Sequence, residues 1–273
     1  MSSYKVVASD LDGTLFDNES KISRENLDAI NELLAKNVQF VPSSGRTLSE
    51  MPAEITGNSA IRYIIYSNGA AVLDRQTGKS ILTCIPNSMV RKILDKLNSY
   101  ETHITIRHNG KSVVDSAYQR DCHYDYYNVC EAHRDAVLKF ATFTDDFMEF
   151  CYSADNAEVI SVFFHNYDDI AVCKNYFEKV CNLRVVQASE YNLEIMNIDA
   201  GKGNALSILA DMLGISICET VSIGDSDNDC SITKTAGLGL AVSNACESLK
   251  EIADEIICSN EEHVVEYVLS HYF

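Results

Sequence analysis

Short apolar runs alternate with amphipathic segments at both ends of the chain. The runs are typical of strands buried on both faces, and they lie at residues 6–8, 38–41, 62–66, 219–223, 238–242 and 255–258. Segments with helical spacing of apolar residues separate them, at residues 23–36, 47–55, 205–213, 246–253 and 262–271. Ser23 is the expected N-cap of the first helix, and Gly214 is expected to end the third. This alternation predicts an α/β fold with a doubly wound, Rossmann-like parallel sheet.

The pattern changes in the middle of the chain. Two pairs of strands have hairpin signals, at residues 70–73 with 80–85 and at residues 103–107 with 112–114, the second pair flanking Asn109-Gly110. Further strands are predicted at 158–165, 183–187 and 191–198, and helices at 89–97 and 168–180. Tight hairpins mixed with helices indicate an α+β unit with an antiparallel sheet. We therefore expect a core of residues 1–84 and 196–273, and an inserted α+β domain of residues 85–195.

Composition and charge narrow the function classes. The chain has 273 residues, of which 46% are hydrophobic and 23% charged, as in soluble globular proteins. No apolar run approaches the roughly 18 residues of a membrane helix, and the N-terminus lacks the apolar core of a signal peptide, so we expect a cytoplasmic protein. The net charge of −18 argues against nucleic acid and anionic membranes as partners. The ten cysteines include no Cys-x-x-Cys pair, which argues against a structural zinc site.

Polar side chains gather in four clusters, each of which follows a predicted strand or opens a predicted helix. The clusters are Asp10 with Asp12, Ser44 with Gly45, Lys202, and Asp225 with Asn228 and Asp229. One such cluster alone would be weak evidence, because carboxylates are common at protein surfaces. A doubly wound sheet, however, brings together the loops at the carboxyl ends of its strands. We therefore expect the four clusters to form one site.

The chemistry of the four clusters is complementary. Four carboxylates together offer the oxygen ligands that suit a hard divalent cation, with Mg²⁺ the expected ion: Asp10, Asp12, Asp225 and Asp229. Lys202 adds a positive charge. The amides of Ser44 and Gly45 are expected to open towards the N-terminus of the helix over 47–55, which would bind an anion. A cation site, a lysine and backbone amides around a carboxylate indicate phosphoryl transfer in which that carboxylate attacks phosphorus.

In order and spacing, these clusters resemble the four motifs of the haloacid dehalogenase superfamily. The matching segments are Asp10-Leu11-Asp12-Gly13-Thr14-Leu15, Ser44-Gly45-Arg46, Lys202-Gly203 and Gly224-Asp225-Ser226-Asp227-Asn228-Asp229. The insertion between the second and third motifs is similar to the type-two cap of the Cof-type phosphatases, which determines substrate specificity. Leu193-Glu194-Ile195 and Ser67-Asn68-Gly69-Ala70 also resemble that subfamily. Two departures are Ser44, where threonine is commoner, and residues 259–264, which lack a frequent aspartate-glycine pair.

The resemblance implies a role for each matching residue. Asp10 would be the nucleophile that forms an aspartyl-phosphate, and Asp12 the general acid and base. The metal would be bound by the carboxylates of Asp10 and Asp225 and by the backbone carbonyl of Asp12, with Asp229 as a further ligand or an anchor behind them. The transferred phosphate would be held by Ser44, Gly45, Lys202 and Asn228. Asp10 would stay ionised beside the cation, whereas Asp12 would lie slightly away from it.

The expected activity is Mg²⁺-dependent hydrolysis of small phosphorylated metabolites, sugar phosphates first among them, by a monomer or weak homodimer. A phosphotransferase or phosphomutase acting on sugar phosphates would use the same site and is the alternative. A non-catalytic binding module ranks below both, because every motif acid is present.

Several other residues allow two interpretations. Arg46 either forms a salt bridge at the start of a helix or contacts the substrate, and Asn68 either caps a turn or contributes to the site. Asp227 is expected to be a solvated loop acid. Six residues of the inserted domain are candidates for a substrate pocket, although most are expected to be packing or surface residues: His103, Arg107, His108, Tyr124, Tyr126 and Tyr127.

Overall fold

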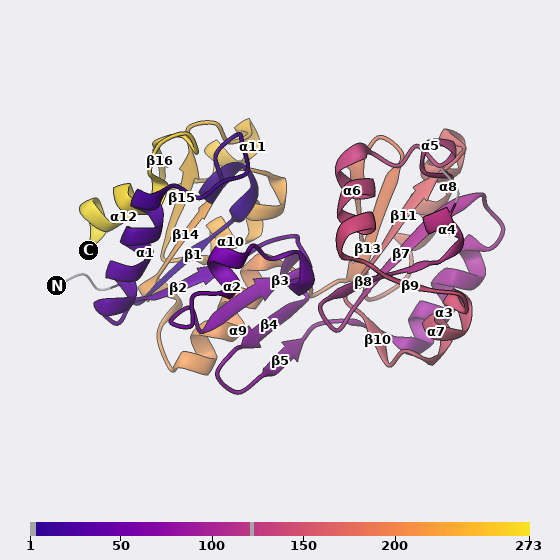
Figure 1. The fold of residues 1–273 in the computed structure, drawn as a ribbon, viewed down its shortest axis with the longest axis horizontal. Helices are drawn as coiled ribbons and strands as arrows, with labels where there is room; N and C mark the ends of the chain where they lie inside the picture. Colours follow the sequence, from indigo (N-terminus) through magenta and orange to yellow (C-terminus); the bar gives the residue numbers. More distant parts are fainter. Residues whose placement is uncertain (1–3, 121–122) are drawn as a thin grey trace. The chain divides into compact units, whose positions relative to one another are not determined.

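The apolar run at the start of the chain forms an interior strand of a parallel sheet, as the computed structural model in Figure 1 shows. The structure describes residues 4–120 and 123–273. Five parallel strands run in the order β16-β15-β14-β1-β2, with bounds Glu255–Ile257, Leu238–Val242, Thr220–Gly224, Val6–Ser9 and Gln39–Pro42. Every residue of β1 is buried, as a strand with neighbours on both sides requires. The predicted α/β fold is confirmed.

A second, smaller sheet continues from the edge of the first. Ser43, directly after β2, pairs with Ile65 of β3 in a parallel bridge. Strand β3 also pairs antiparallel with β4, and β5 completes a three-stranded sheet, with bounds Tyr63–Tyr66, Ala71–Asp74 and Lys79–Leu82. Strands β4 and β5 coincide closely with the hairpin predicted at 70–85.

Helices pack against the parallel sheet and against each other. Helices α9 (Lys202–Leu213) and α10 (Cys230–Thr235) pack on the sheet face that carries Val6 and Ala8. Helices α1 (Arg24–Ala35) and α12 (Val264–Tyr272) pack against one another. The predicted caps are confirmed, because the Ser23 side chain accepts from the Asn26 amide and Gly214 closes α9 with φ +64°. Helix α11 (Glu247–Lys250) is shorter than expected.

The prediction of one helix over 47–55 is wrong. The chain instead makes a short 3₁₀ turn at Leu48–Glu50 and then a single helical turn, α2 (Ala53–Thr56). Pro52 stands between them, and proline disfavours the helical conformation of the residue before it. Apolar spacing alone therefore overestimated the length of this helix.

The middle of the chain forms a six-stranded sheet that is mostly antiparallel. Its strands run in the order β12-β13-β11-β7-β8-β9, with bounds Leu183–Ser189, Asn192–Asn197, Val159–Phe164, Thr102–His108, Lys111–Asp115 and Thr142–Thr144. The turn between β7 and β8 is the predicted Asn109-Gly110, whose φ values of +50° and +72° are those of a tight hairpin. Strands β6 (Ile85–Pro86) and β10 (Asn156–Ala157) form a separate small pair.

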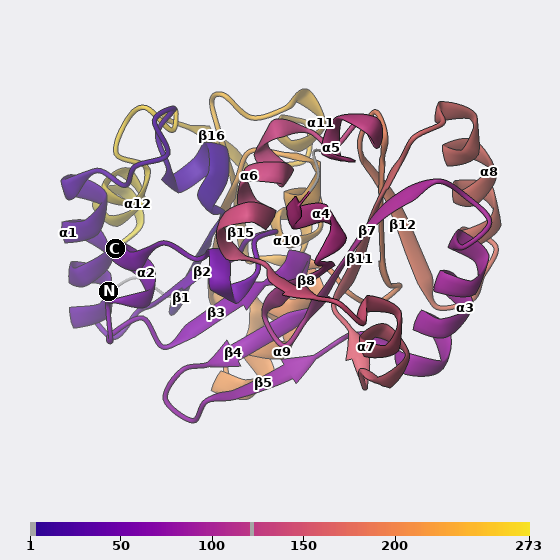
Figure 2. The same cartoon turned by 45° about the vertical axis from the view of Figure 1, so that its right-hand side comes forward.

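Helices cover both faces of this sheet, as Figure 2 shows. One face packs on α3 (Asn87–Leu97), α7 (Phe147–Ser153) and α8 (Tyr167–Phe177). The other face packs on the segment containing α4, α5 and α6, with bounds Ala117–Arg120, His123–Tyr126 and Glu131–Phe140. No helix or strand was predicted between residues 115 and 157.

The described residues divide into two compact units. The first comprises residues 4–46, 51–81 and 201–273, and the second comprises Thr47–Glu50 and Leu82–Ala200, apart from residues 121–122. The boundaries expected from the sequence, at 84/85 and 195/196, stay a prediction. Within the described parts of the chain, no helix is both long and apolar enough to cross a bilayer.

Candidate active site

Asp10 is the first residue after β1, and the sheet fixes its backbone. Its amide donates to the Ile223 carbonyl of β14 at 2.9 Å, which continues the ladder between the two central strands. Its side chain is almost completely buried, and one carboxylate oxygen accepts from Lys202 Nζ at 2.8 Å. The carboxyl end of the strand therefore points a buried acid at a buried cation.

Lys202 is the first residue of α9 and is completely buried. Its ammonium donates to Asp10 Oδ1 at 2.8 Å, to Asp229 Oδ1 at 2.6 Å and to Asn228 Oδ1 at 3.5 Å. Burial by itself lowers the pKa of Lys202, but Asp10 and Asp229 outweigh burial and hold that pKa above its usual value. The lysine therefore stays charged and ties together residues that are 192 and 27 positions away in the sequence.

Three of the predicted carboxylates meet in one cluster. One oxygen from each of Asp10, Asp225 and Asp229 lies within 4.8 Å of the others. Burial raises the pKa of Asp10 well above its usual value, with Lys202 opposing the rise, and burial followed by Asp229 raises the pKa of Asp225. Carboxylates crowded in this way favour a further cation among them, and an all-oxygen donor set fits a hard divalent ion.

The loop after β14 shapes the cluster. Asp229 Oδ2 accepts from the amides of Asp225 and Ser226 at 3.1 and 3.3 Å, which fixes one carboxylate against the backbone of the other. Thr14 Oγ1 donates to Asp225 Oδ1 at 3.3 Å. The Asp225 side chain is therefore oriented from the β1 loop as well as from its own.

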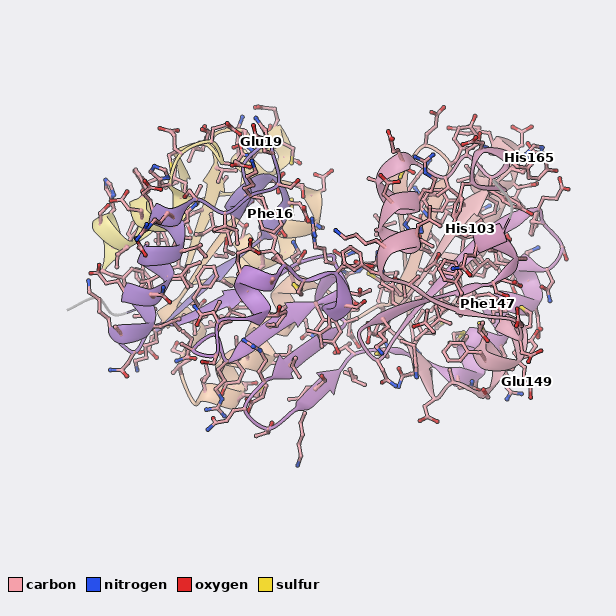
Figure 3. All side chains as sticks on the ribbon, in the orientation of Figure 1. Phe16, Glu19, His103, Phe147, Glu149 and His165 are labelled. Carbon is pink, nitrogen blue, oxygen red and sulfur yellow. The ribbon has the colours of Figure 1, made fainter. Side chains whose placement is uncertain are left out.

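Asp12 lies apart from this cluster. Its side chain is 54% exposed, and both of its oxygens accept from Arg46, Nε at 2.8 Å and Nη2 at 2.6 Å. Of the two interpretations of Arg46, a salt bridge is thus present, although it links two motifs instead of starting a helix. The guanidinium lies 5.2 Å from the ring centre of Phe16, which Figure 3 labels. This pairing could not be predicted from the sequence, because nothing in the spacing of the two residues indicates that they meet.

Ser44 and Gly45 follow β2, but the expected helix N-terminus is absent there. The Ser44 amide donates to the Ile65 carbonyl at 3.0 Å and is therefore already bonded to the neighbouring strand. The segment that follows contains only a 3₁₀ turn and the single helical turn of α2. The prediction of an anion site at a helix N-terminus is therefore wrong. The Ser44 hydroxyl accepts from the Arg46 amide at 3.2 Å, and its contact with phosphate stays a prediction.

Asn228 and Asn68 link the loops after β14 and β3. Asn228 Nδ2 donates to Asn68 Oδ1 at 3.3 Å, so Asn68 contributes to the site region as well as to its own turn. Gly69 has φ +82°, and a Cβ atom there would lie 2.3 Å from the Gly201 carbonyl carbon. This close approach requires glycine and brings the β3 loop against the start of α9.

Two asparagines near the C-terminus support the loop that carries the nucleophile candidate. Asn244 Nδ2 donates to the Gly13 carbonyl at 2.8 Å, and Asn260 Nδ2 donates to the Phe16 carbonyl at 3.0 Å. The Asn260 amide in turn donates to Asn244 Oδ1 at 2.9 Å. This supporting role was not predicted from the sequence, in which residues 259–264 differ from the subfamily pattern.

The candidate pocket residues of the second unit have mostly structural roles. His103 is completely buried, its ring centre lies 4.2 Å from that of Tyr118, and burial lowers its pKa to about 4. Tyr124 is buried beside it. Arg107 pairs with Glu194 of β13 at 3.2 Å. The other three candidates also have partners within the unit, with His108 bonded to a backbone carbonyl, Tyr126 stacked on a histidine, and Tyr127 in contact with other aromatic rings.

Comparisons with known proteins identify the family of this chain. The sequence model of the haloacid dehalogenase-like hydrolases matches residues 7–269. Phosphatase YwpJ of Bacillus subtilis is 27% identical over 98% of this chain and 99% of its own length. From the same organism, 5-amino-6-(5-phospho-D-ribitylamino)uracil phosphatase YcsE is 27% identical over 98% and 95%. A solved haloacid dehalogenase-like hydrolase of B. subtilis is 27% identical with a TM-score of 0.80, covering 98% of this chain and 100% of that one. The chain therefore belongs to the haloacid dehalogenase-like hydrolases, within their Cof-type phosphatases.

Proposed function

We propose that the protein is a Mg²⁺-dependent phosphatase that hydrolyses small phosphorylated metabolites, such as sugar phosphates, through an aspartyl-phosphate. The observation that carries the proposal is the contact of buried Lys202 with Asp10 at 2.8 Å, inside a cluster of three carboxylates. The named phosphatases among the relatives support the reaction class. The name of one relative states the ester on which that relative acts. The proposal for this chain extends only to the class of small phosphate esters.

Asp10 and Asp12 have different tasks in the proposed reaction. A carboxylate oxygen of Asp10 attacks phosphorus in line while the bond to the leaving oxygen breaks, and Asp12 gives its proton to that oxygen. Asp12 then accepts a proton from the water that attacks the aspartyl-phosphate, which releases phosphate and restores Asp10. The exposure of Asp12 and the burial of Asp10 suit these tasks, because solvent reaches the Asp12 side chain and is largely excluded from that of Asp10.

The metal would be held by the carboxylates of Asp10 and Asp225 and by the backbone carbonyl of Asp12, with Asp229 as a further ligand or as an anchor behind them. Bound there, Mg²⁺ would neutralise charge on the phosphate oxygens. Lys202, Ser44, Gly45 and Asn228 are the proposed phosphate-binding residues. Of these, Lys202 brings a full positive charge, which would oppose locally the net charge of −18 of the chain.

The second unit is the proposed substrate-specificity domain, in keeping with the insertion expected at 85–195. The proposed partner is a small-molecule phosphate ester, and the proposed assembly is a monomer or weak homodimer in the cytoplasm. A small ester needs polar groups that distinguish its leaving portion, and the first unit supplies mainly groups for the phosphate. Specificity is therefore expected to change with substitutions in the second unit and not in the four motifs.

Replacing Gly13 with alanine is expected to weaken cation binding. A Cβ at this position would lie 2.5 Å from Asp225 Oδ2, and the backbone φ of +75° adds about 1–2 kcal/mol of strain. The displaced Asp225 should lower the affinity for Mg²⁺ by about 10–100-fold, measured by calorimetric titration. The matched control is Gly78→Ala, which has φ +70° and open space around the new methyl group. Equal affinities for Mg²⁺ in the two variants would show that Asp225 does not bind the ion.

A hydrolysis screen tests the proposed function directly. The protein is assayed with a panel of phosphate esters, with Mg²⁺ and with a chelator, and the products are separated. We expect free phosphate from at least one ester class, with the activity lost on chelation and restored by Mg²⁺. Conversion of a sugar phosphate to its isomer, or transfer to a second sugar, would favour the phosphotransferase alternative. Failure to act on any ester with Mg²⁺ present would favour a binding module.

A further inference from the structure

Arg46 and Asp12 form a pair with a defined orientation. The guanidinium contacts both carboxylate oxygens, through Nε at 2.8 Å and Nη2 at 2.6 Å, and this two-pronged geometry fixes the plane of the carboxylate. Both side chains remain partly open, at 30% and 54% exposure, and such pairs contribute little to stability. The orientation of Asp12, and not the stability of the fold, is therefore what this pair most affects.

Arg46 is itself fixed on both sides of its backbone. Its amide donates to Ser44 Oγ at 3.2 Å, and its carbonyl accepts from the Ser67 amide at 2.9 Å. Its guanidinium packs over Phe16, in the same loop as Asp12. A side chain anchored in this way is a suitable support for a second side chain.

Arg46 is also the last residue of the first unit before the chain enters the second. Residues Thr47–Glu50 belong to the second unit. Within that unit, the Ser49 amide donates to the Gly110 carbonyl of the β7–β8 hairpin at 3.0 Å, and Ser112 Oγ donates to Glu50 at 3.3 Å. The support of Asp12 is thus joined by one peptide bond to a segment that the second unit holds.

We infer that Arg46 is a positioning residue that orients Asp12 for both proton transfers of the proposed phosphatase reaction. A carboxylate has about four lone-pair positions, and the fork of Arg46 uses two of them. The remaining two are held in a fixed direction, available first for the proton given to the leaving oxygen and then for the proton taken from water. The inference rests on the proposed function, since Asp12 needs this orientation only if it transfers protons.

The test compares two esters that differ in their need for an acid. Nitrophenyl phosphate has a leaving group that departs without a proton, whereas an alkyl phosphate requires one. In Arg46→Lys, which keeps the charge but loses the fork, kcat/KM for the alkyl ester should fall about 10²-fold. For the nitrophenyl ester, kcat/KM should change little, while kcat falls because hydrolysis of the aspartyl-phosphate still needs a base.

A double-variant cycle separates orientation from general damage. In a chain that already carries Asp12→Ala, adding Arg46→Lys should cause no further loss, because the group that Arg46 orients is gone. The matched control is Arg62→Lys, since Arg62 makes the same fork onto Asp74, through Nε at 3.0 Å and Nη2 at 2.8 Å, beside the ring of Tyr63. Arg62→Lys should break a fork of the same kind and leave kcat/KM for both esters unchanged.

Each outcome decides the inference. The positioning role would be overturned by equal losses of kcat/KM on the two esters, or by losses of kcat/KM that add to those of Asp12→Ala. A rise in KM alone would also overturn it, in favour of a substrate contact by Arg46. Wild-type protein that hydrolyses neither ester would overturn the proposed function and the inference together. If the wild-type protein is active and Arg46→Lys loses the same fraction of kcat/KM on both esters, the inference alone is overturned.

Discussion

Asp10→Asn is expected to abolish turnover while leaving the fold intact. The amide cannot attack phosphorus, so kcat should fall by at least about 10⁴-fold, the scale seen when a covalent nucleophile is removed. The fold should tolerate the change, because the amide oxygen can still accept from Lys202 and one of three crowded carboxylates is neutralised. Phosphate release and the unfolding midpoint in denaturant, measured on the same preparations, check the two halves of this expectation.

Asp227→Asn is the matched control for this variant. Asp227 lies in the fourth matching segment, between Asp225 and Asp229. Its carboxylate accepts from Ser248 and lies outside the cluster of three carboxylates. Its replacement should leave kcat within about threefold of wild type, as expected for a surface substitution that disturbs no reacting group. An Asp10→Asn protein as active as Asp227→Asn would rule out the covalent mechanism.

Lys202→Met is expected to be the most destabilising single substitution in the site. It removes the ammonium shared by Asp10 and Asp229, both of which would remain buried as unpaired carboxylates. Removing one partner of a buried ion pair costs about 3–5 kcal/mol, and the loss of the proposed phosphate-binding cation should lower kcat by about 10²–10³-fold. Denaturant unfolding with a chelator present measures the loss of stability without compensation by a divalent ion.

Two further variants test whether the loss of stability in Lys202→Met comes from the buried charges left without a partner. Lys250→Met removes a lysine from a pair with the exposed side chain of Glu247 and should cost far less stability than Lys202→Met. Lys202→Met combined with Asp229→Asn should be more stable than Lys202→Met alone, because one of the stranded charges is gone. If Lys202→Met unfolds at the same denaturant concentration as wild type, the buried ammonium does not hold the three carboxylates together.

Local patterns were enough to predict much of the first unit. The apolar runs at β1, β14 and β15 could be identified because strands buried on both faces have few polar residues. Gly214 indicated the end of α9 because glycine readily adopts the left-handed conformation found there. The convergence of Asp10, Lys202 and Asp229 followed from topology, since the carboxyl ends of parallel strands meet at one edge. In these places local preference and tertiary position agree.

Other features depend on contacts that no local pattern encodes. The Arg46–Asp12 pair joins residues 34 positions apart, and its geometry follows from how two loops meet. The helix expected over 47–55 is broken into a 3₁₀ turn and the single turn of α2, because Pro52 and the contacts of Thr47–Glu50 with the β7–β8 hairpin outweigh apolar spacing. Between residues 115 and 157, helices α4, α5 and α7 have only 4, 4 and 7 residues, too few to establish a period.

The central claim is that Asp10 carries the phosphoryl group during turnover. Asp12→Asn should slow hydrolysis of the aspartyl-phosphate more than its formation from nitrophenyl phosphate, so the intermediate should accumulate. Acid quenching of this variant during turnover, followed by mass spectrometry of its peptides, should find a phosphoryl group on Asp10 together with a burst of nitrophenol of about one per active site. A burst without that modification, or with the phosphoryl group on another residue, would contradict the claim.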